Sequence, residues 1–273
     1  MADLTITSPA NPRLKSLVGL RRRRTREESG LTLVEGFEEL SLAMEAGVVP
    51  QTLYYCPELM LDVHEQSRVV DAVRAEGSET VQVSRQAFEK VAYREGPDGF
   101  LAVVGAVARQ CADLTVSPTA LTVLCEGVEK PGNLGAMLRT ADAAGAEAVI
   151  AADPVTDWGN PNLVRASKGT VFSVQVASDP TEDALAWLDR QGIALVATTP
   201  DTDLDFTDVD YTGPVAIAVG AEKYGLTDRV LDHAAYRVRI PMVGKANSLN
   251  VATSAAIVIY EAVRQRRQPS PSH

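Results

Sequence analysis

Segments with the period of a strand alternate along this chain with segments that have the period of a helix. In the first half, strands are predicted over 51–56, 81–83 and 100–107, and helices over 37–46, 62–76 and 85–92. In the second half, strands are predicted over 121–125, 148–152, 171–177, 193–198, 215–219 and 236–240, and helices over 134–144, 162–168, 182–190, 226–234 and 249–267. Such alternation covers a parallel or mixed sheet with helices, so an α/β fold is predicted.

The alternation is interrupted near the middle of the chain, at Ser117-Pro118-Thr119. The length of 273 residues is enough for two domains with a core in each. We therefore predict a first domain over 1–107, a linker over 108–120 and a second domain over 121–267. The polar, proline-containing segment 268–273 is predicted to be a disordered tail.

Composition excludes several classes of protein. The chain has 26 Lys and Arg against 36 Asp and Glu, a net charge of −10, which excludes a uniformly basic nucleic-acid binder but not a local basic patch. Its 3 cysteines lack paired spacing, which excludes a disulfide framework and a usual structural zinc site and suits a reducing compartment. No apolar run approaches the ~18 residues of a membrane helix, and the first residues lack a secretory signal. We expect a cytoplasmic protein with no membrane partner.

Positive charge is concentrated in segment 13–26. Its basic residues are Arg13, Lys15, Arg21, Arg22, Arg23, Arg24 and Arg26, whereas Asp3 is the only acid before Glu27. The charge pattern fits a solvated helix face or a frayed terminal arm as well as it fits a phosphate-binding arm. Arginine suits the second role because its planar guanidinium can hold two phosphate oxygens at once.

Several familiar sites are missing from the sequence. Segment 127–132 has the glycine spacing of a P-loop, but Asn133 and Leu134 stand where Lys and Ser or Thr would hold phosphate and magnesium. No G-x-G-x-x-G follows a predicted strand, and no G-x-S-x-G occurs. The 3 histidines are scattered, so no metal site is predicted. Hydride transfer, metal-assisted hydrolysis and acyl-enzyme chemistry are therefore disfavoured.

Three segments that follow predicted strands of the second half carry candidate functional residues. The first is 131–140, in which Asn133 suits a helix N-cap. Arg139 is expected to project from the face that Gly135 leaves uncovered. There it could bind a phosphate, or it could be the surface arginine of an ordinary amphipathic helix.

The other two segments contain a turn and a helix start. In 218–226, two glycines let the backbone pass close to a bound molecule, and Glu222 is either a solvent-facing acid or a partner for Arg139. In 240–251, Ser248 suits the N-cap of the last helix, and small residues after it allow close helix packing. Taken singly, each segment also fits plain capping and packing.

Together and in this order, the three segments resemble the signature motifs of the SpoU family of RNA ribose 2′-O-methyltransferases, which belongs to the SPOUT superfamily. The motif residues are Asn133-x-Gly135-x-x-x-Arg139-Thr140, then Gly220-x-Glu222-x-x-Gly225-Leu226, then Ile240-Pro241-Met242 with Ser248-Leu249-Asn250-Val251. The resemblance covers about 121–266, and it departs from the family at Ala252-Thr253, where members often have Ser-Val. The first half, with Asn11-Pro12, the basic segment and the stretch 30–36, is similar to a substrate-binding domain related to ribosomal protein L30e.

The resemblance implies a fold, a cofactor and a set of site residues. The second domain would be a parallel α/β sheet whose C-terminal end forms a deep trefoil knot, and the cofactor would be S-adenosylmethionine. The implied cofactor-binding residues are Thr198, Thr199, Gly220, Ile240, Met242, Ser248, Leu249 and Asn250. The implied catalytic residues are Arg139, Asn133, Glu222, Ser248 and Asn250. A ribose 2′-hydroxyl would attack the methyl group in line, without a metal, and a phosphate oxygen or Glu222 could accept its proton because a guanidinium stays protonated.

The implied partners are RNA and a second copy of the chain, bound through the second domain. The separate N-terminal domain favours 23S ribosomal RNA, and the basic segment would contact it. A tRNA substrate remains an alternative, as does a catalytically silent RNA-binding or ribosome-assembly protein. Some members of the family protect antibiotic producers by methylating their own ribosomes, so a resistance role is a further hypothesis.

Overall fold

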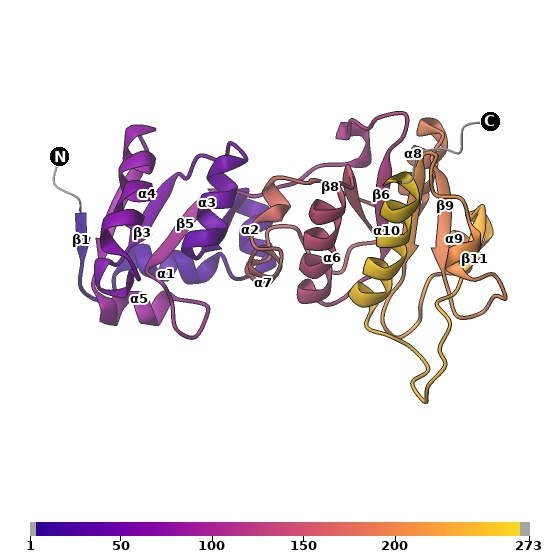
Figure 1. The fold of residues 1–273 in the computed structure, drawn as a ribbon. Coiled ribbons are helices and arrows are strands. Elements are labelled where there is room, and N and C mark those ends of the chain that lie inside the picture. The colour runs from indigo at the N-terminus through magenta and orange to yellow at the C-terminus, as the bar shows by residue number, and fades with distance from the viewer. Residues whose placement is uncertain (1–3, 268–273) are drawn as a thin grey trace. The chain divides into compact units, whose positions relative to one another are not determined.

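Two β-sheets, each in its own compact unit, organise the chain (Figure 1). The computed structural model describes residues 4–267, and the predicted tail at 268–273 lies outside them. Unit 1 contains the residues up to Val107 together with 157–173, and unit 2 contains 108–156 together with the residues from Val174 onward. Unit 2 therefore starts where the linker is predicted, whereas 157–173, expected in the second domain, belongs to unit 1.

Unit 1 is built on a mixed sheet with the strand order β1-β4-β3-β5-β2. Its strands are β1 (Leu4–Ile6), β2 (Leu31–Glu35), β3 (Thr52–Tyr55), β4 (Glu79–Val83) and β5 (Phe100–Gly105). β3 runs parallel to β4 and antiparallel to β5, in agreement with the predicted mixed sheet. Its α-helices are α1 (Pro12–Gly19), α2 (Arg23–Ser29), α3 (Phe37–Glu45), α4 (Val63–Ala75), α5 (Arg85–Val91) and α7 (Pro161–Ala166). The basic segment thus forms two short helices rather than an arm.

Unit 2 is built on six strands in the order β11-β9-β10-β6-β7-β8, and every pairing between them is parallel. The strands are β6 (Leu121–Glu126), β7 (Ala148–Ala152), β8 (Gln175–Asp179), β9 (Ala194–Thr198), β10 (Val215–Val219) and β11 (Tyr236–Val238). The predicted parallel sheet is confirmed, apart from β8, which begins later than the predicted strand at 171–177. The knot is not tested by these pairings and stays a prediction.

Four α-helices belong to unit 2: α6 (Pro131–Ala144), α8 (Thr181–Gln191), α9 (Asp228–His233) and α10 (Val251–Arg267). The helix α10 lies beside α6 (Figure 1). The sequence places Val251, Ala255, Val258, Ile259 and Ala262 on one apolar stripe of this helix, and all but the half-buried Val251 are fully buried in the core.

Arg266 joins the end of α10 to the loops that precede β6 and β10. Its guanidinium donates to the carbonyl groups of Thr119 at 2.8 Å, Ala120 at 3.3 Å, Tyr211 at 2.9 Å and Gly213 at 2.6 Å. One arginine thus donates to a group of backbone acceptors, among them the Ala120 carbonyl, which also accepts the Val215 N–H at 2.9 Å.

Candidate active site

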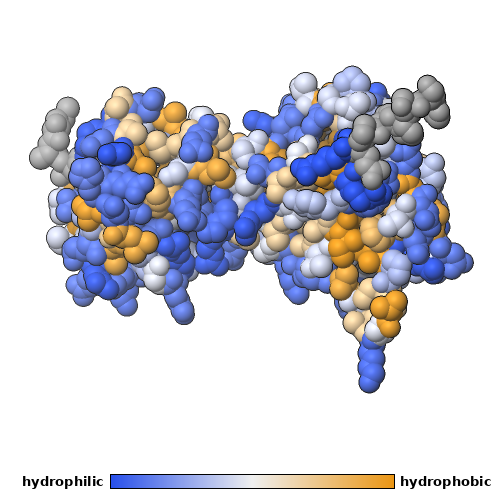
Figure 2. All heavy atoms as spheres, viewed as in Figure 1, coloured by the Kyte–Doolittle hydropathy of each residue, from blue (hydrophilic) through white to orange (hydrophobic). Residues whose placement is uncertain are grey.

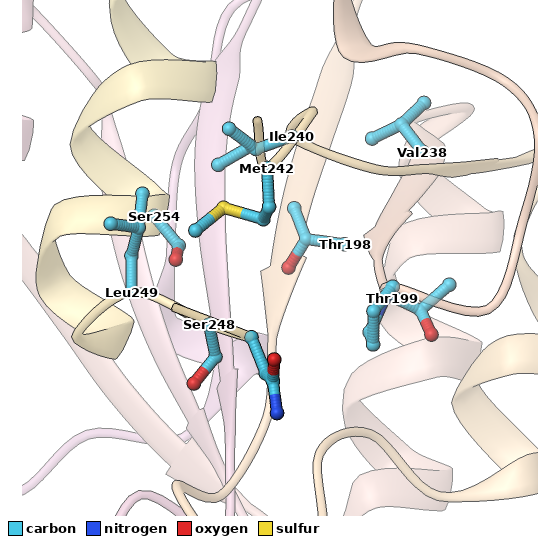
Figure 3. Close-up of a pocket in the computed structure, with 10 residues that line it drawn as sticks. Thr198, Thr199, Val238, Ile240, Met242, Ser248, Leu249 and Ser254 are labelled. Carbon is cyan, nitrogen blue, oxygen red and sulfur yellow. The ribbon is translucent and has the colours of Figure 1, made fainter. Parts of the chain in front are cut away.

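A cavity lies at the edge of the unit 2 sheet where β9 and β11 end (Figure 3). In a parallel sheet the carboxyl ends of the strands share one edge, where ligands of α/β proteins usually bind. The cavity measures about 480 Å³, including the space open to solvent, which is within the usual range for small-molecule sites. Its lining residues are Thr198, Thr199, Pro200, Val238, Ile240, Met242, Asn247, Ser248, Leu249 and Ser254.

Most of the predicted cofactor-binding residues line this cavity. They are Thr198, Thr199, Ile240, Met242, Ser248 and Leu249, whereas Gly220 and Asn250 do not line it. Pro200, Val238, Asn247 and Ser254 were not predicted from the sequence. Pro200 and Asn247 adjoin predicted residues in the sequence, and Val238 lies two residues before Ile240. Ser254 lies one helical turn after Asn250, whose carbonyl accepts its backbone N–H at 2.9 Å.

The walls of the cavity combine apolar side chains with hydroxyl groups. The apolar ones are Val238, Ile240, Met242 and Leu249, and Figure 3 shows the Met242 thioether directed toward α10, where Ser254 lies. The hydroxyl of Thr198 is already engaged, since it donates to the Ala218 carbonyl at 2.8 Å. Apolar walls with a few placed polar groups suit a ligand that has an aromatic base and polar ends.

A chain of hydrogen bonds joins the three candidate segments of the sequence. The Nδ2 of Asn133, in α6, donates to Glu222 Oε1 at 2.6 Å. The Nδ2 of Asn250, at the start of α10, donates to Asn133 Oδ1 at 3.1 Å. Asn133, Glu222 and Asn250 are thus brought together, and Asn250 directly follows Leu249 of the cavity wall. We refer to these three side chains as the Asn–Glu–Asn network.

The environment of Glu222 keeps its carboxyl group ionised. Partial burial raises the pKa of Glu222, but several groups together lower the pKa below its usual value: the backbone N–H of Glu222 itself, the Asn133 side chain, the backbone N–H of Glu129 and the charge of Lys130. A carboxylate held in this way accepts hydrogen bonds well and is a weak base. It therefore suits a positioning role better than that of proton acceptor.

The turn that carries Glu222 is shaped by a close contact between two glycines. A Cβ atom on Gly220 would lie 2.1 Å from the carbonyl carbon of Gly225, and Gly225 has a φ of +70°. The N–H of Gly225 donates to the Ala221 carbonyl at 2.8 Å. The turn itself therefore requires glycine at 220, and the close approach of a bound molecule to this backbone stays a prediction.

Both predicted N-caps are corrected by the structure. The helix α6 begins at Pro131, so Asn133 lies inside its first turn and its side chain is free to reach Glu222. The helix α10 begins at Val251 and is capped by Asn250 instead of Ser248. The Oδ1 of Asn250 accepts from the backbone N–H groups of Ala252 at 2.9 Å and Thr253 at 3.4 Å.

Arg139 lies on the exposed side of α6, in a shallow hollow that Ala136, Thr140, Ala143 and Tyr260 of α10 help to line. Gly135 is buried, so it does not open the exposed face as expected. In the described part of the chain Arg139 makes no ion pair with Glu222, whose partner is Asn133.

Four residues of the basic segment are paired with carboxylates: Arg13 with Glu79 at 2.6 Å, Arg23 with Glu27 at 2.7 Å, Arg24 with Glu28 at 2.7 Å, and Arg26 with Asp157 at 2.5 Å. The Arg26 side chain is only 2% exposed and also donates to the Leu20 carbonyl. The prediction that Arg26 binds RNA is therefore wrong, because its guanidinium is enclosed in unit 1. Lys15 and Arg22 are exposed and stay candidates.

Residues 4–267 contain neither a candidate membrane-spanning helix nor a candidate metal cluster. No helix in that range is both long enough and apolar enough to span a membrane. Over the same residues, no three side chains of His, Cys, Asp or Glu gather into a possible metal site.

Two family models match the chain. Residues 120–260 match the SpoU rRNA Methylase family, and residues 11–102 match the MRM3-like substrate binding domain. These spans cover most of the sequence of unit 2 and most of the sequence of unit 1 that precedes Val107.

Known proteins resemble the chain over different lengths. A 23S rRNA (uridine(2479)-2′-O)-methyltransferase of Streptomyces viridochromogenes is 33% identical over 92% of this chain and 88% of its own. A tRNA (guanosine(18)-2′-O)-methyltransferase of Escherichia coli is 41% identical over 59% of this chain and 70% of its own. The crystal structure of an AdoMet-bound rRNA methyltransferase from Sinorhizobium meliloti is 30% identical, with a TM-score of 0.87 over 95% of this chain and 97% of its own.

Proposed function

Because the chain belongs to the SpoU rRNA methylase family and is an RNA ribose 2′-O-methyltransferase that uses S-adenosylmethionine, we propose that its substrate is 23S ribosomal RNA. The extent of the matches carries this proposal. The Streptomyces enzyme that acts on 23S rRNA is similar along nearly the whole of both chains, whereas the tRNA enzyme is similar over little more than half of this one. A substrate-binding domain at 11–102 supports the same assignment, and a cytoplasmic location follows from it.

The substrate is tested by offering two RNAs under the same conditions. Purified protein and methyl-labelled S-adenosylmethionine are incubated with 23S rRNA or with bulk tRNA, both from a strain that lacks the corresponding gene. We expect label in 23S rRNA alone. Label in tRNA alone would overturn the substrate assignment and leave the enzyme class intact.

We propose that the cavity at the ends of β9 and β11 binds S-adenosylmethionine, which supplies a methyl group activated by a sulfonium. The apolar side chains of Ile240, Met242 and Leu249 would hold the flat base, and the hydroxyls of Thr199 and Ser248 would meet polar groups. Asn250 would not contact the cofactor and would act indirectly, by capping α10 and fixing the Asn–Glu–Asn network.

Arg139 is proposed to grip an RNA phosphate and orient the 2′-hydroxyl. It is exposed, and a guanidinium holds two oxygens at once. Replacing Arg139 by Lys keeps the charge and removes the fork, so we predict that kcat falls about tenfold or more with RNA saturating. Nearly full turnover of Arg139→Lys in single-turnover methyl transfer would show that the fork is not needed.

The active form is proposed to be a dimer joined through unit 2. Hydrophobic residues gather on the visible surface over α10 and the segment before it (Figure 2), and the half-buried Ala256 and Ile257 lie on this helix. Such a surface beside Arg139 fits a second copy of the chain, which would bring the Arg139 of one chain near the cofactor of the other. Light scattering should give twice the mass of one chain, and a monomer that is fully active would contradict the proposal.

A further inference from the structure

Two arginines lie near the ring of one tyrosine in unit 1. The guanidinium carbon of Arg21 lies 5.1 Å from the centre of the Tyr93 ring, and that of Arg165 lies 5.9 Å from it. The Tyr93 hydroxyl accepts a hydrogen bond from Asn162 Nδ2 at 2.7 Å, with Asn162 and Arg165 both in α7. We call Arg21, Tyr93 and Arg165 the Arg–Tyr–Arg cluster.

We propose that the Arg–Tyr–Arg cluster is an RNA-binding site, at which an unpaired nucleotide stacks its base on a guanidinium plane or on the tyrosine while its phosphate meets the arginines. The proposal rests on the proposed function, since it takes RNA to be the substrate. Bases stack on aromatic rings and arginine planes in the recognition of single-stranded RNA, and phosphates bind guanidinium groups in pairs of hydrogen bonds.

The two arginines of the cluster have other partners than most of the arginines in segment 13–26. Arg13, Arg23, Arg24 and Arg26 each pair with a carboxylate, as described above. Within residues 4–267, neither Arg21 nor Arg165 forms an ion pair. Arg21 is instead held by its Nη2, which donates to the carbonyls of Val91 at 2.7 Å and Ala92 at 3.0 Å, and Arg165 is exposed. Arg21 also acts on the buried Glu35, where its charge opposes the rise that burial causes in the pKa of that carboxyl, so the exposed Arg165 is the main site for a phosphate in the cluster.

The buried side chain of Glu35 fixes the backbone at Tyr93. Glu35, at the end of β2, accepts the backbone N–H of Tyr93 at 2.8 Å and that of Arg94 at 3.3 Å. Arg94 in turn pairs with Asp98 at 2.8 Å. A ring held at its backbone and at its hydroxyl loses little conformational entropy when a base stacks on it, which favours binding.

A hollow adjoins the ring. It is lined by Glu89, Ala92, Tyr93, Arg94, Glu95, Gly96 and Pro97, and it measures about 730 Å³ including the space open to solvent. Of its two acids, Glu89 is paired with Arg85 at 2.9 Å. The hollow is large enough for a nucleotide beside the tyrosine.

Arg165 reaches the cluster because 157–173 is anchored in unit 1. The bidentate pair of Arg26 with Asp157 holds one end of the segment, and the Thr32 hydroxyl donates to the Gly159 carbonyl. Lys168 pairs with Glu38 at 2.9 Å further along. The RNA site of unit 1 therefore combines residues of the first domain with a residue that lies outside the 11–102 match.

The test measures binding of the full chain to a 23S rRNA transcript by filter retention, at about 50 and about 200 mM salt. Arg165→Ala and Tyr93→Leu should each weaken binding at least about fivefold at the lower salt, because each removes a stacking or phosphate contact. Arg165→Lys should recover only part of the affinity, and Tyr93→Phe, which keeps the ring, should stay within about twofold of wild type. The charge-matched control is Arg74→Ala, which removes an arginine of α4 already paired with Asp71 at 2.6 Å.

Cofactor binding and thermal unfolding distinguish a loss of RNA contacts from a loss of the fold. The affinity for S-adenosylmethionine and the thermal unfolding temperature should match wild type in Arg165→Ala, which shows that the fold and the cofactor site are intact. If Arg165→Ala and Tyr93→Leu bind RNA no more weakly than Arg74→Ala does, the proposal that the cluster binds RNA is overturned. A wild type that binds the transcript without methylating it would overturn the 23S assignment instead, and one that does not bind it would overturn both.

Discussion

Asn250 serves α10 and the Asn–Glu–Asn network with different atoms, so one substitution can separate the two roles. Its Oδ1 caps the helix through the N–H of Ala252, and its Nδ2 donates to Asn133. Asn250→Asp keeps a capping oxygen and replaces the donor by a second acceptor. Asn250→Ala removes both.

The expected magnitudes differ for stability and for catalysis. Loss of a side-chain N-cap costs about 1 kcal/mol, so Asn250→Ala should lower the unfolding temperature by about 2–4 °C, whereas Asn250→Asp should leave it nearly unchanged. In Asn250→Asp the Asn133 amide lies between two carboxylates and can donate well to only one of them. A hydrogen bond to a charged group is worth about 1.5–3 kcal/mol, which corresponds to a fall in kcat of about tenfold to a hundredfold.

Calorimetric unfolding and single-turnover methyl transfer to RNA measure the two effects on the same samples. We predict that the Asn250→Asp protein has wild-type stability and low activity. We also predict that the protein binds S-adenosylmethionine with little change, because Asn250 does not line the cavity. Wild-type activity in Asn250→Asp would refute the role of the network, and unchanged stability in Asn250→Ala would refute the cap.

Three other predictions concern the turn, the end of α10 and the titration of Glu222. Gly220→Ala places a Cβ against the Gly225 backbone and should abolish activity and lower stability by at least about 2 kcal/mol, whereas Gly213→Ala, with open space around its Cβ, should do neither. Arg266→Ala removes the guanidinium that donates to the carbonyls of Thr119, Tyr211 and Gly213 and should lower the free energy of unfolding by about 2–4 kcal/mol in urea titrations, against less than about 0.5 kcal/mol for the exposed Arg264→Ala. Because the folded pKa of Glu222 lies below its usual value near 4.5, its stabilising bonds are complete above that value and are lost only as the pH falls through the lower folded pKa. Glu222→Gln should therefore change the rate by the same factor from about pH 6 to about pH 9, and a factor that varies with pH in that range would contradict this.

The sequence predicts the long, strongly periodic elements well. The stripe of α10 and the buried strands of unit 2 lie close to their predicted positions, because burial on one helix face or in a central parallel strand leaves a clear pattern. Short elements leave weaker patterns. The strand β1 has three residues and β2 has five, and neither was predicted.

The displaced strand β8 has a local cause. Segment 167–173 forms a tight turn and a 3-10 helix over Thr170–Phe172, preceded by Gly169 with a φ of +85°. The hydroxyls of Ser167, Thr170 and Ser173 donate to backbone carbonyls three residues earlier. Such local bonds compete with strand formation and override the apolar pattern that suggested a strand at 171–177.

The motif residues could be grouped from the sequence, but their contacts could not. Asn133 was expected to cap a helix that starts at 134. Because α6 begins at Pro131, Asn133 lies inside the helix and instead links Glu222 to Asn250. The Arg–Tyr–Arg cluster depends on the packing of 157–173 in unit 1. Nothing in the local sequence around Arg165 or Tyr93 indicates that they meet.

The position of the transferred methyl group tests the central claim most directly. After reaction with labelled S-adenosylmethionine, 23S rRNA is digested with alkali, which cleaves every linkage except those next to a 2′-O-methyl ribose. We predict that the label appears in one alkali-resistant dinucleotide and is lost when the Asn–Glu–Asn network is broken by Asn133→Ala. Label recovered in mononucleotides would place the methyl group on a base and would contradict the account.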